Sequence, residues 1–153
     1  MILIPQLEAY SNQVASVIPE IKRVEMAVTE EDLGKLMQDH KAGDNILMLT
    51  LVPEHGMDGQ QDAAKYENVC GFFFLEKVDY SKLKRNEYIE VFTRTQAVAK
   101  KFMDKLIMDK SNGEGLFCGM MAWLQESSFN AGPTKMLNGC NGYYVQITIK
   151  TNP

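Results

Sequence analysis

Near its carboxyl end the chain reads NGCNGYYVQITIK (residues 138–150), which predicts a tight turn followed by a β-strand. Asparagine and glycine tolerate the positive φ angles that two-residue hairpin turns need. We expect Cys140 to belong to this turn and not to act as a nucleophile, because no histidine or cluster of cations lies nearby in the sequence to lower its pKa. The next residues alternate, so one strand face is expected to carry Tyr143, Val145, Ile147 and Ile149, and the other Tyr144, Gln146, Thr148 and Lys150.

Two segments before this one also predict strands. Residues 46–52 are nearly all apolar and end at Pro53, which is typical of a strand covered on both faces. Residues 66–78 contain the run Phe72-Phe73-Phe74, and a strand would show these rings to both faces of a sheet. We expect them in the core.

A long helix is predicted between the strands, at about 82–110, because residues 81–110 contain no glycine or proline and end before Asn112-Gly113. Its apolar stripe is expected to comprise Ile89, Phe92, Gln96, Ala99, Phe102, Met103 and Leu106.

Two shorter helices are predicted in the N-terminal third, with a strand at 21–28 between them. The first runs from Pro5 to Pro19, and the second is capped by Thr29 and ends at Gly43. Beyond the long helix, strands are expected at 117–127 and 134–137, separated by a break at 131–133. The order of elements predicts an α+β fold in one domain, 1–153, with a mostly antiparallel sheet packed against the long helix. Whether the strand at 21–28 pairs in parallel stays open.

Composition excludes several classes of function. The net charge of −4 and pI near 5.2 argue against binding by phosphate neutralisation, so no nucleic acid is expected as a partner. The amino terminus has no signal-peptide pattern and no apolar run is long enough for a bilayer, so we expect a cytoplasmic protein with no membrane partner. Three cysteines are a small and odd number for a disulfide framework, so they are interpreted as reduced.

No catalytic, metal-binding or cofactor-binding set is predicted, and we expect a protein that is not an enzyme. His40 is interpreted as a cation at a helix end and His55 as a solvated residue, since neither shows ligand spacing. The glycine clusters precede strands, whereas phosphate sites need glycines that open a helix.

Two surfaces are candidates for partner contact. The polar segment 53–65 is long for a loop in a compact domain and is expected to contact a partner or to be solvated. Its candidate residues are Glu54, His55, Met57, Asp58, Gln60 and Asp62. The long helix carries a candidate basic face that would meet an acidic partner or remain solvated, formed by Arg94, Lys100, Lys101 and Lys105.

The last half of the chain resembles small virion proteins of phages and prophages, of the tail-terminator or head-tail joining type. The resemblance covers residues 82–151, where a long charged helix is followed by FCGMMAWLQ (117–125), SSFNAGPTKML (127–137) and NGYYVQITIKT (141–151). It implies a non-enzymatic subunit that forms a homo-oligomeric ring, expected to be hexameric, with tail-tube and connector partners in the virion. The N-terminal helix and strand do not match this pattern.

The alternative is an α+β domain that binds a small molecule or peptide. Its pocket would lie between the long helix and the strand containing Phe72-Phe73-Phe74.

Overall fold

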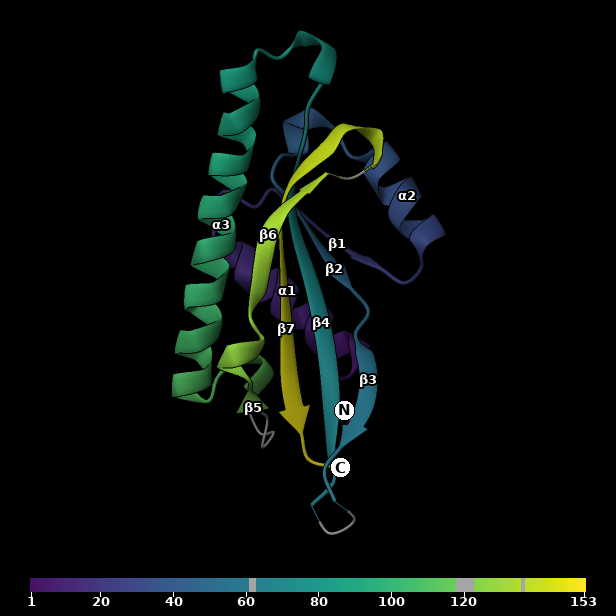
Figure 1. Ribbon diagram of the computed structural model, residues 1–153, viewed down its shortest axis with the longest axis vertical. Coiled ribbons are helices and arrows are strands. Elements are labelled where there is room, and N and C mark those ends of the chain that lie inside the picture. The colour runs from purple at the N-terminus through teal and green to yellow at the C-terminus, as the bar shows by residue number, and fades with distance from the viewer. Residues whose placement is uncertain (61–62, 118–122, 136) are drawn as a thin grey trace.

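The fold is α+β and is built around one twisted, mostly antiparallel sheet (Figure 1). The structure is a computed structural model and describes residues 1–60, 63–117, 123–135 and 137–153. The α-helices of this part are α1 (Ile4–Val17), α2 (Glu30–Asp39) and α3 (Arg85–Asn112). The predicted arrangement of one long helix with two shorter N-terminal helices is thus confirmed.

Two long strands form the centre of the sheet. Strand β4 (Lys65–Lys77) pairs antiparallel with β7 (Cys140–Thr151), from Tyr66 opposite Thr151 to Lys77 opposite Cys140. On the other side, β4 pairs antiparallel with both β2 (Leu47–Leu51) and β3 (Glu54–Asp58). The outer strands β5 (Trp123–Leu124) and β6 (Asn130–Lys135) pair antiparallel with β7, while β1 (Arg23–Ala27) pairs with β2. The β1–β2 pairing is parallel, which answers the question that the sequence left open.

One face of the sheet is covered by α1 and α3. Alternation along the strands points Phe72 and Phe74 to this face, where both rings contact Phe102 of α3 at centroid distances of 4.6 and 5.2 Å. All three side chains are fully buried. The apolar positions of α1, spaced by three and four residues, cover the rest of the face with Leu7, Tyr10 and Val14. This packing confirms that Phe72 and Phe74 belong to the core, whereas Phe73 points to the opposite face and is half-buried, so the prediction is wrong for that ring.

The opposite face is covered only in part, by α2. Met37 of α2 packs against Leu47, Leu49 and Leu75 in a second, smaller cluster. In Figure 1, α1 crosses behind the sheet, α3 runs along its side, and α2 lies at one corner. The part of this face beyond α2, next to the β3–β4 hairpin, has no helix over it in the described structure.

Helix and turn boundaries follow the predicted local signals. The Thr29 side chain accepts a hydrogen bond from the Asp32 backbone N–H at 3.2 Å, which caps α2. Gly113 has φ +66° and ends α3, as glycine does at helix C-termini. The turn before β7 has φ angles of +57° at Asn138 and +76° at Gly139, as expected for an Asn-Gly turn.

Several predicted boundaries are wrong. The segment 53–65 is not a long loop, because β3 and β4 form a hairpin within it. The break at 131–133 lies inside β6, an edge strand in which Pro133 is tolerated. Helix α2 ends at Asp39, before Gly43. Of the predicted strand 117–127, only β5 is a strand in the described part, and 118–122 lies outside it. Short 3-10 helices occupy Ala42–Asp44, Tyr80–Lys82, Gly115–Phe117, Glu126–Ser128 and Leu137–Gly139.

The predicted apolar stripe of α3 is only partly correct. Ala99, Phe102 and Leu106 are buried as expected, but Ile89 is 51 % exposed. The first two turns of α3 instead bury Val91 and, further on, Thr95. The buried positions Val91, Thr95, Val98, Phe102 and Leu106 are spaced by three and four residues and form one continuous stripe, so the predicted stripe was placed one position off at the start of the helix.

Candidate functional site: the uncovered face of the sheet

The uncovered part of the sheet contains a shallow hollow at the centre of its exposed surface. Leu51 of β2, Gly71 and Phe73 of β4, and Tyr144 of β7 line this hollow, which measures about 190 Å³. Each of these residues is half-buried. Since strand residues alternate, they point away from Phe72 and Phe74, and therefore away from α1 and α3.

The hollow is formed by aromatic side chains around a glycine. The rings of Phe73 and Tyr144 lie 6.4 Å apart between centroids, and the Tyr144 hydroxyl donates to Asn130 Oδ1 on β6 at 3.3 Å. Gly71 lacks a side chain where a Cβ would meet Leu51 Cδ1 at 3.3 Å. The hollow thus exists because one strand position has no side chain to fill it.

Glu54 is a charged residue that lines the hollow, and further charged residues lie beyond it on the same face. The carboxylate of Glu54, at its rim, makes no ion pair or hydrogen bond with any described residue. Further along the hairpin, Asp58 forms an ion pair with Lys150 of β7, and this hydrogen bond lowers the pKa of Asp58 and raises that of Lys150. Lys65 lies over the ring of Trp123. The carboxylate of Glu54 therefore remains available to an outside cation.

The predicted contact residues of 53–65 lie on both sides of the hairpin. Glu54 and Asp58 lie on the uncovered face, whereas His55 and Met57 lie on the side of α1. His55 Nδ1 is 3.0 Å from Oδ1 of buried Asn68, and Met57 is 62 % exposed. The Gln60 carbonyl accepts from the Ala63 N–H at 2.8 Å, while Asp62 lies outside the described residues.

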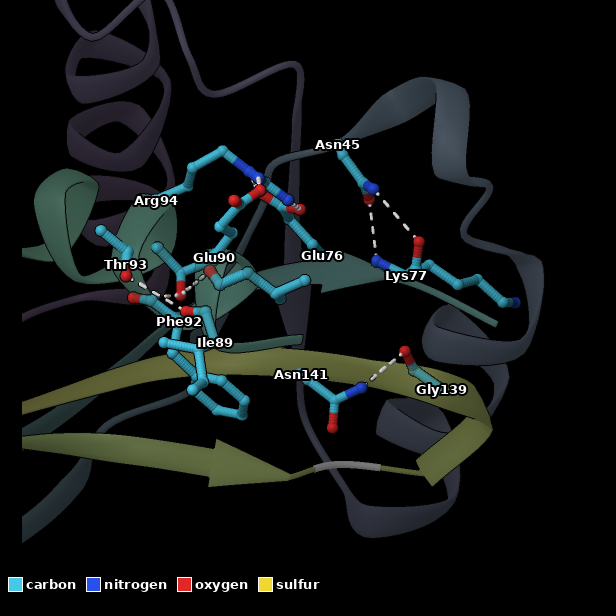
Figure 2. Close-up of polar contacts among 12 residues, drawn as sticks. Asn45, Glu76, Lys77, Ile89, Glu90, Phe92, Thr93, Arg94, Gly139 and Asn141 are labelled. Atoms are coloured by element: carbon cyan, nitrogen blue, oxygen red, sulfur yellow. Dashed lines mark hydrogen bonds and ion pairs between the residues drawn. The ribbon is translucent and has the colours of Figure 1, made fainter. Parts of the chain in front are cut away.

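Each residue of the predicted basic helix face has a carboxylate partner within the chain. Arg94 makes a bidentate pair with Glu76 of β4, with N–O distances of 2.9 and 2.8 Å (Figure 2), and this hydrogen bonding raises the pKa of Arg94. The other pairs are Lys100–Asp104, Lys101–Glu20 and Lys105–Asp109. Contact between these cations and an acidic partner stays a prediction, but the pairing reduces the charge that they offer to it.

Two of these pairs hold α3 in place. Glu76 is buried, so its pair with Arg94 ties α3 to the sheet beside Asn45, which is hydrogen-bonded to the Lys77 backbone (Figure 2). At the other end, buried Asp109 accepts from Lys105 Nζ at 2.9 Å and from the Tyr10 hydroxyl of α1, also at 2.9 Å. Burial raises the pKa of Tyr10, with a further contribution from Asp109. These side chains serve to dock the helices.

His40 lies at the end of α2, as was predicted, but it does not serve there as the expected cation. It is the C-cap residue but is 1 % exposed, and burial lowers its pKa. Its Nε2 donates to Asn45 Oδ1 at 2.8 Å, and its Nδ1 has no hydrogen-bond partner among the described residues. The Lys77 ammonium instead donates to the last carbonyls of α2, those of Met37 and Gln38. A lysine from the sheet thus takes the role expected of the histidine.

The described residues form neither a site with an activated cysteine nor a metal-binding cluster. Cys70 and Cys140 are free and buried, and burial raises both pKa values, although Lys77, which lies opposite Cys140 in the sheet, acts to lower that of Cys140. Cys118 lies outside the described residues. No group of three or more histidine, cysteine or acidic side chains is close enough to hold a metal ion in residues 1–60, 63–117, 123–135 and 137–153.

The pocket expected between the long helix and the phenylalanine strand is filled. Phe102 occupies the space against Phe72 and Phe74, and none of the three rings is exposed. The hollow found in the structure lies on the other face, next to Phe73. The alternation of side chains along β7 predicted that Tyr144 lies on the face opposite Val145. Only the pairing register of β4 and β7 shows that Tyr144 lies beside Phe73.

No family model matches this chain, and no curated protein matches it. Among the helices of the described residues, none has both the length and the apolar character that crossing a bilayer requires.

Proposed function

We propose that this chain is a non-enzymatic structural subunit that assembles with further copies into a closed ring, as tail-terminator proteins of phages do. Six copies in the ring, with tail-tube and connector proteins as further partners in the virion, are what the resemblance in residues 82–151 implies. The proposal is supported chiefly by the uncovered sheet face, on which Leu51, Phe73 and Tyr144 are half-buried around a hollow. A protein surface with clustered aromatic and aliphatic side chains is typical of protein contact sites.

The size of the hollow favours a protein partner over a small molecule. At about 190 Å³ it is smaller than the roughly 300–1,000 Å³ of most small-molecule pockets. It can receive one side chain from another protein. The location next to the projecting β3–β4 hairpin adds a second element that another subunit can reach (Figure 1).

Native mass spectrometry and mass photometry of the purified chain test the proposal. We expect a closed oligomer of about six copies, because identical head-to-tail contacts close into a ring. Negative-stain electron microscopy should show rings of the same subunit number. If the chain is a monomer at all concentrations up to about 100 µM, which is well above the dissociation constants of specific protein interfaces, self-assembly is contradicted. A monomer that retains a bound small molecule supports the ligand-binding alternative instead.

A further inference from the structure

The contact that would join two copies can be inferred from a second surface, at the start of α3. Arg85 and Ile89 lie four residues apart and therefore on the same side of the helix. Ile89 is 51 % exposed, and Arg85 makes no ion pair with any described residue. Together they present an aliphatic side chain with an unpaired cation one turn away.

This combination is unusual within the chain. The other exposed large apolar residues on helices are Ile4 and Val17 of α1 and Ile107 and Met108 of α3. None of these four has, one turn away, a basic side chain without a partner among the described residues. Lys105 and Lys110, the basic residues closest to Ile107 and Met108, pair with Asp109 and Glu126. Ile89 thus differs from these four residues in having Arg85, a cation that no described residue pairs with, one helical turn away.

The hollow on the sheet has the complementary properties. Most of its lining residues are apolar, it has room for one aliphatic side chain, and Glu54 at its rim has no cation of its own among the described residues. An apolar side chain beside a cation matches an apolar hollow beside a carboxylate. Glu54 and Arg85 supply opposite charges of equal size at the two surfaces.

The two surfaces cannot meet within one molecule. Helix α3 packs on the face of the sheet that carries Phe72 and Phe74, whereas the hollow includes Phe73 and opens on the opposite face. A contact between them needs two copies. Because the two surfaces differ, the contact is head-to-tail, and such contacts propagate from copy to copy until they close into a ring.

We propose that Ile89 of one copy enters the hollow of a second copy between Leu51, Phe73 and Tyr144, and that Arg85 of the first copy pairs with Glu54 of the second. This inference rests on the proposed self-assembly and names the residues that form its interface. It gives a role to Glu54 and to the exposed residues at the start of α3, which the fold itself does not need for its stability.

Charge exchange tests the ion pair. We expect Glu54→Arg and Arg85→Glu each to weaken association about tenfold or more, and the double variant to recover most of this loss, since the two charges are exchanged. Glu8→Arg and Lys41→Glu are the matched controls, because both residues are exposed and lie outside the two surfaces. Mass photometry over a dilution series gives the dissociation constants, and circular dichroism confirms that each variant is folded.

A mixing experiment tests the head-to-tail geometry. Ile89→Asp removes the inserted side chain and Glu54→Arg reverses the charge at the hollow, so each variant alone should be a monomer at concentrations below its own weakened dissociation constant and above that of the wild-type contact. Mixed together, they should form a dimer with one intact contact and nothing larger. A photo-crosslinking amino acid in place of Ile89 should attach to residues that line the hollow of the neighbouring copy.

The outcomes separate the two proposals. If the wild-type chain is an oligomer and Glu54→Arg, Arg85→Glu and Ile89→Asp leave its dissociation constant unchanged, the interface is wrong while self-assembly stands. Crosslinks from position 89 to any surface other than the hollow also contradict the interface. A wild-type chain that is monomeric overturns both proposals.

Discussion

The two faces of the sheet differ in how they are covered. On the face of Phe72 and Phe74, two helices exclude water, and aromatic contacts are reinforced by buried polar pairs at both ends of α3. On the face of Phe73, α2 covers one corner and the rest remains half-buried around the hollow. Neighbouring residues of one strand thus have different roles. The first face therefore contributes more to the stability of the fold than the second.

Removing an aromatic ring from each face tests this difference directly. Phe102→Ala should lower the free energy of unfolding by about 3–5 kcal/mol, because it leaves a cavity among fully buried rings. Phe73→Ala should cost roughly half as much, because its ring is partly exposed already. Urea unfolding monitored by circular dichroism measures both. Equal losses would mean that the two faces contribute equally to stability.

The polar docking of α3 is expected to have the next largest effect. Asp109→Ala should lower the free energy of unfolding by about 3 kcal/mol, because it leaves Lys105 and the hydroxyl of Tyr10 without their buried partner. Asp104→Ala is the matched control, since Asp104 pairs with Lys100 at the exposed surface and should cost less than about 0.5 kcal/mol. If the control is as destabilising as Asp109→Ala, docking by the buried network is wrong.

The buried His40 at the end of α2 predicts that the stability of the fold depends on pH. Burial keeps the folded-state pKa of His40 below its ordinary value of 6.5, with Arg23 and Lys77 as nearby cations and Asp44 as the nearby anion. As pH falls through 6.5 the unfolded chain takes up a proton that the folded chain does not, so stability decreases with falling pH. The decrease ends once the pH is below the folded pKa.

Urea titrations at intervals between pH 7 and pH 5 measure this effect. The slope should not exceed about 1.4 kcal/mol per pH unit, the limit for one proton. His40→Asn should flatten the slope in this range, and His55→Asn should leave it in place, because His55 is exposed in β3. A flat profile in the wild-type chain would show that His40 does not couple pH to folding.

A substitution of Glu54, at the rim of the hollow, should change the free energy of unfolding least. Glu54→Gln should change the free energy of unfolding by less than about 0.5 kcal/mol, because the carboxylate is exposed and has no partner among the described residues. Thermal unfolding checks this value. A loss above about 1 kcal/mol would show that the uncovered face contributes to the fold and is not free for contact.

Apolar patterning predicted most of the elements. Helices α1 and α3 and strand β7 repeat their apolar residues at regular spacing, whereas β2 and β4 contain short apolar runs, and both patterns are visible in the sequence. Strand β3 was missed because all five of its residues, Glu54–Asp58, are exposed, and a strand that buries nothing has no hydrophobic pattern. Strand β6 was missed because Gly132 and Pro133 are breakers in most contexts and are accepted here at a sheet edge.

The candidate site was less predictable than the fold. Glu54 was among the predicted contact residues, but Leu51, Gly71 and Tyr144 come from three strands and meet only through the register. Likewise, the cations of α3 were visible in the sequence, whereas Glu76 and Glu20, the partners of Arg94 and Lys101, depend on tertiary structure. Local patterns cannot report which distant carboxylate neutralises a cation.

The pairing of β4 with β7 constrains when the protein can fold during its synthesis. These strands are central to the sheet, yet the residues that pair are separated by at least 63 positions, as in Lys77 and Cys140. The core under α1 and α3 needs Val145, Ile147 and Ile149 of β7 to close. Because β7 is synthesised after α1, β2 and β4, the apolar residues of those elements have no β7 to pack against until residues 140–151 have left the ribosome, and the core can close only from that point.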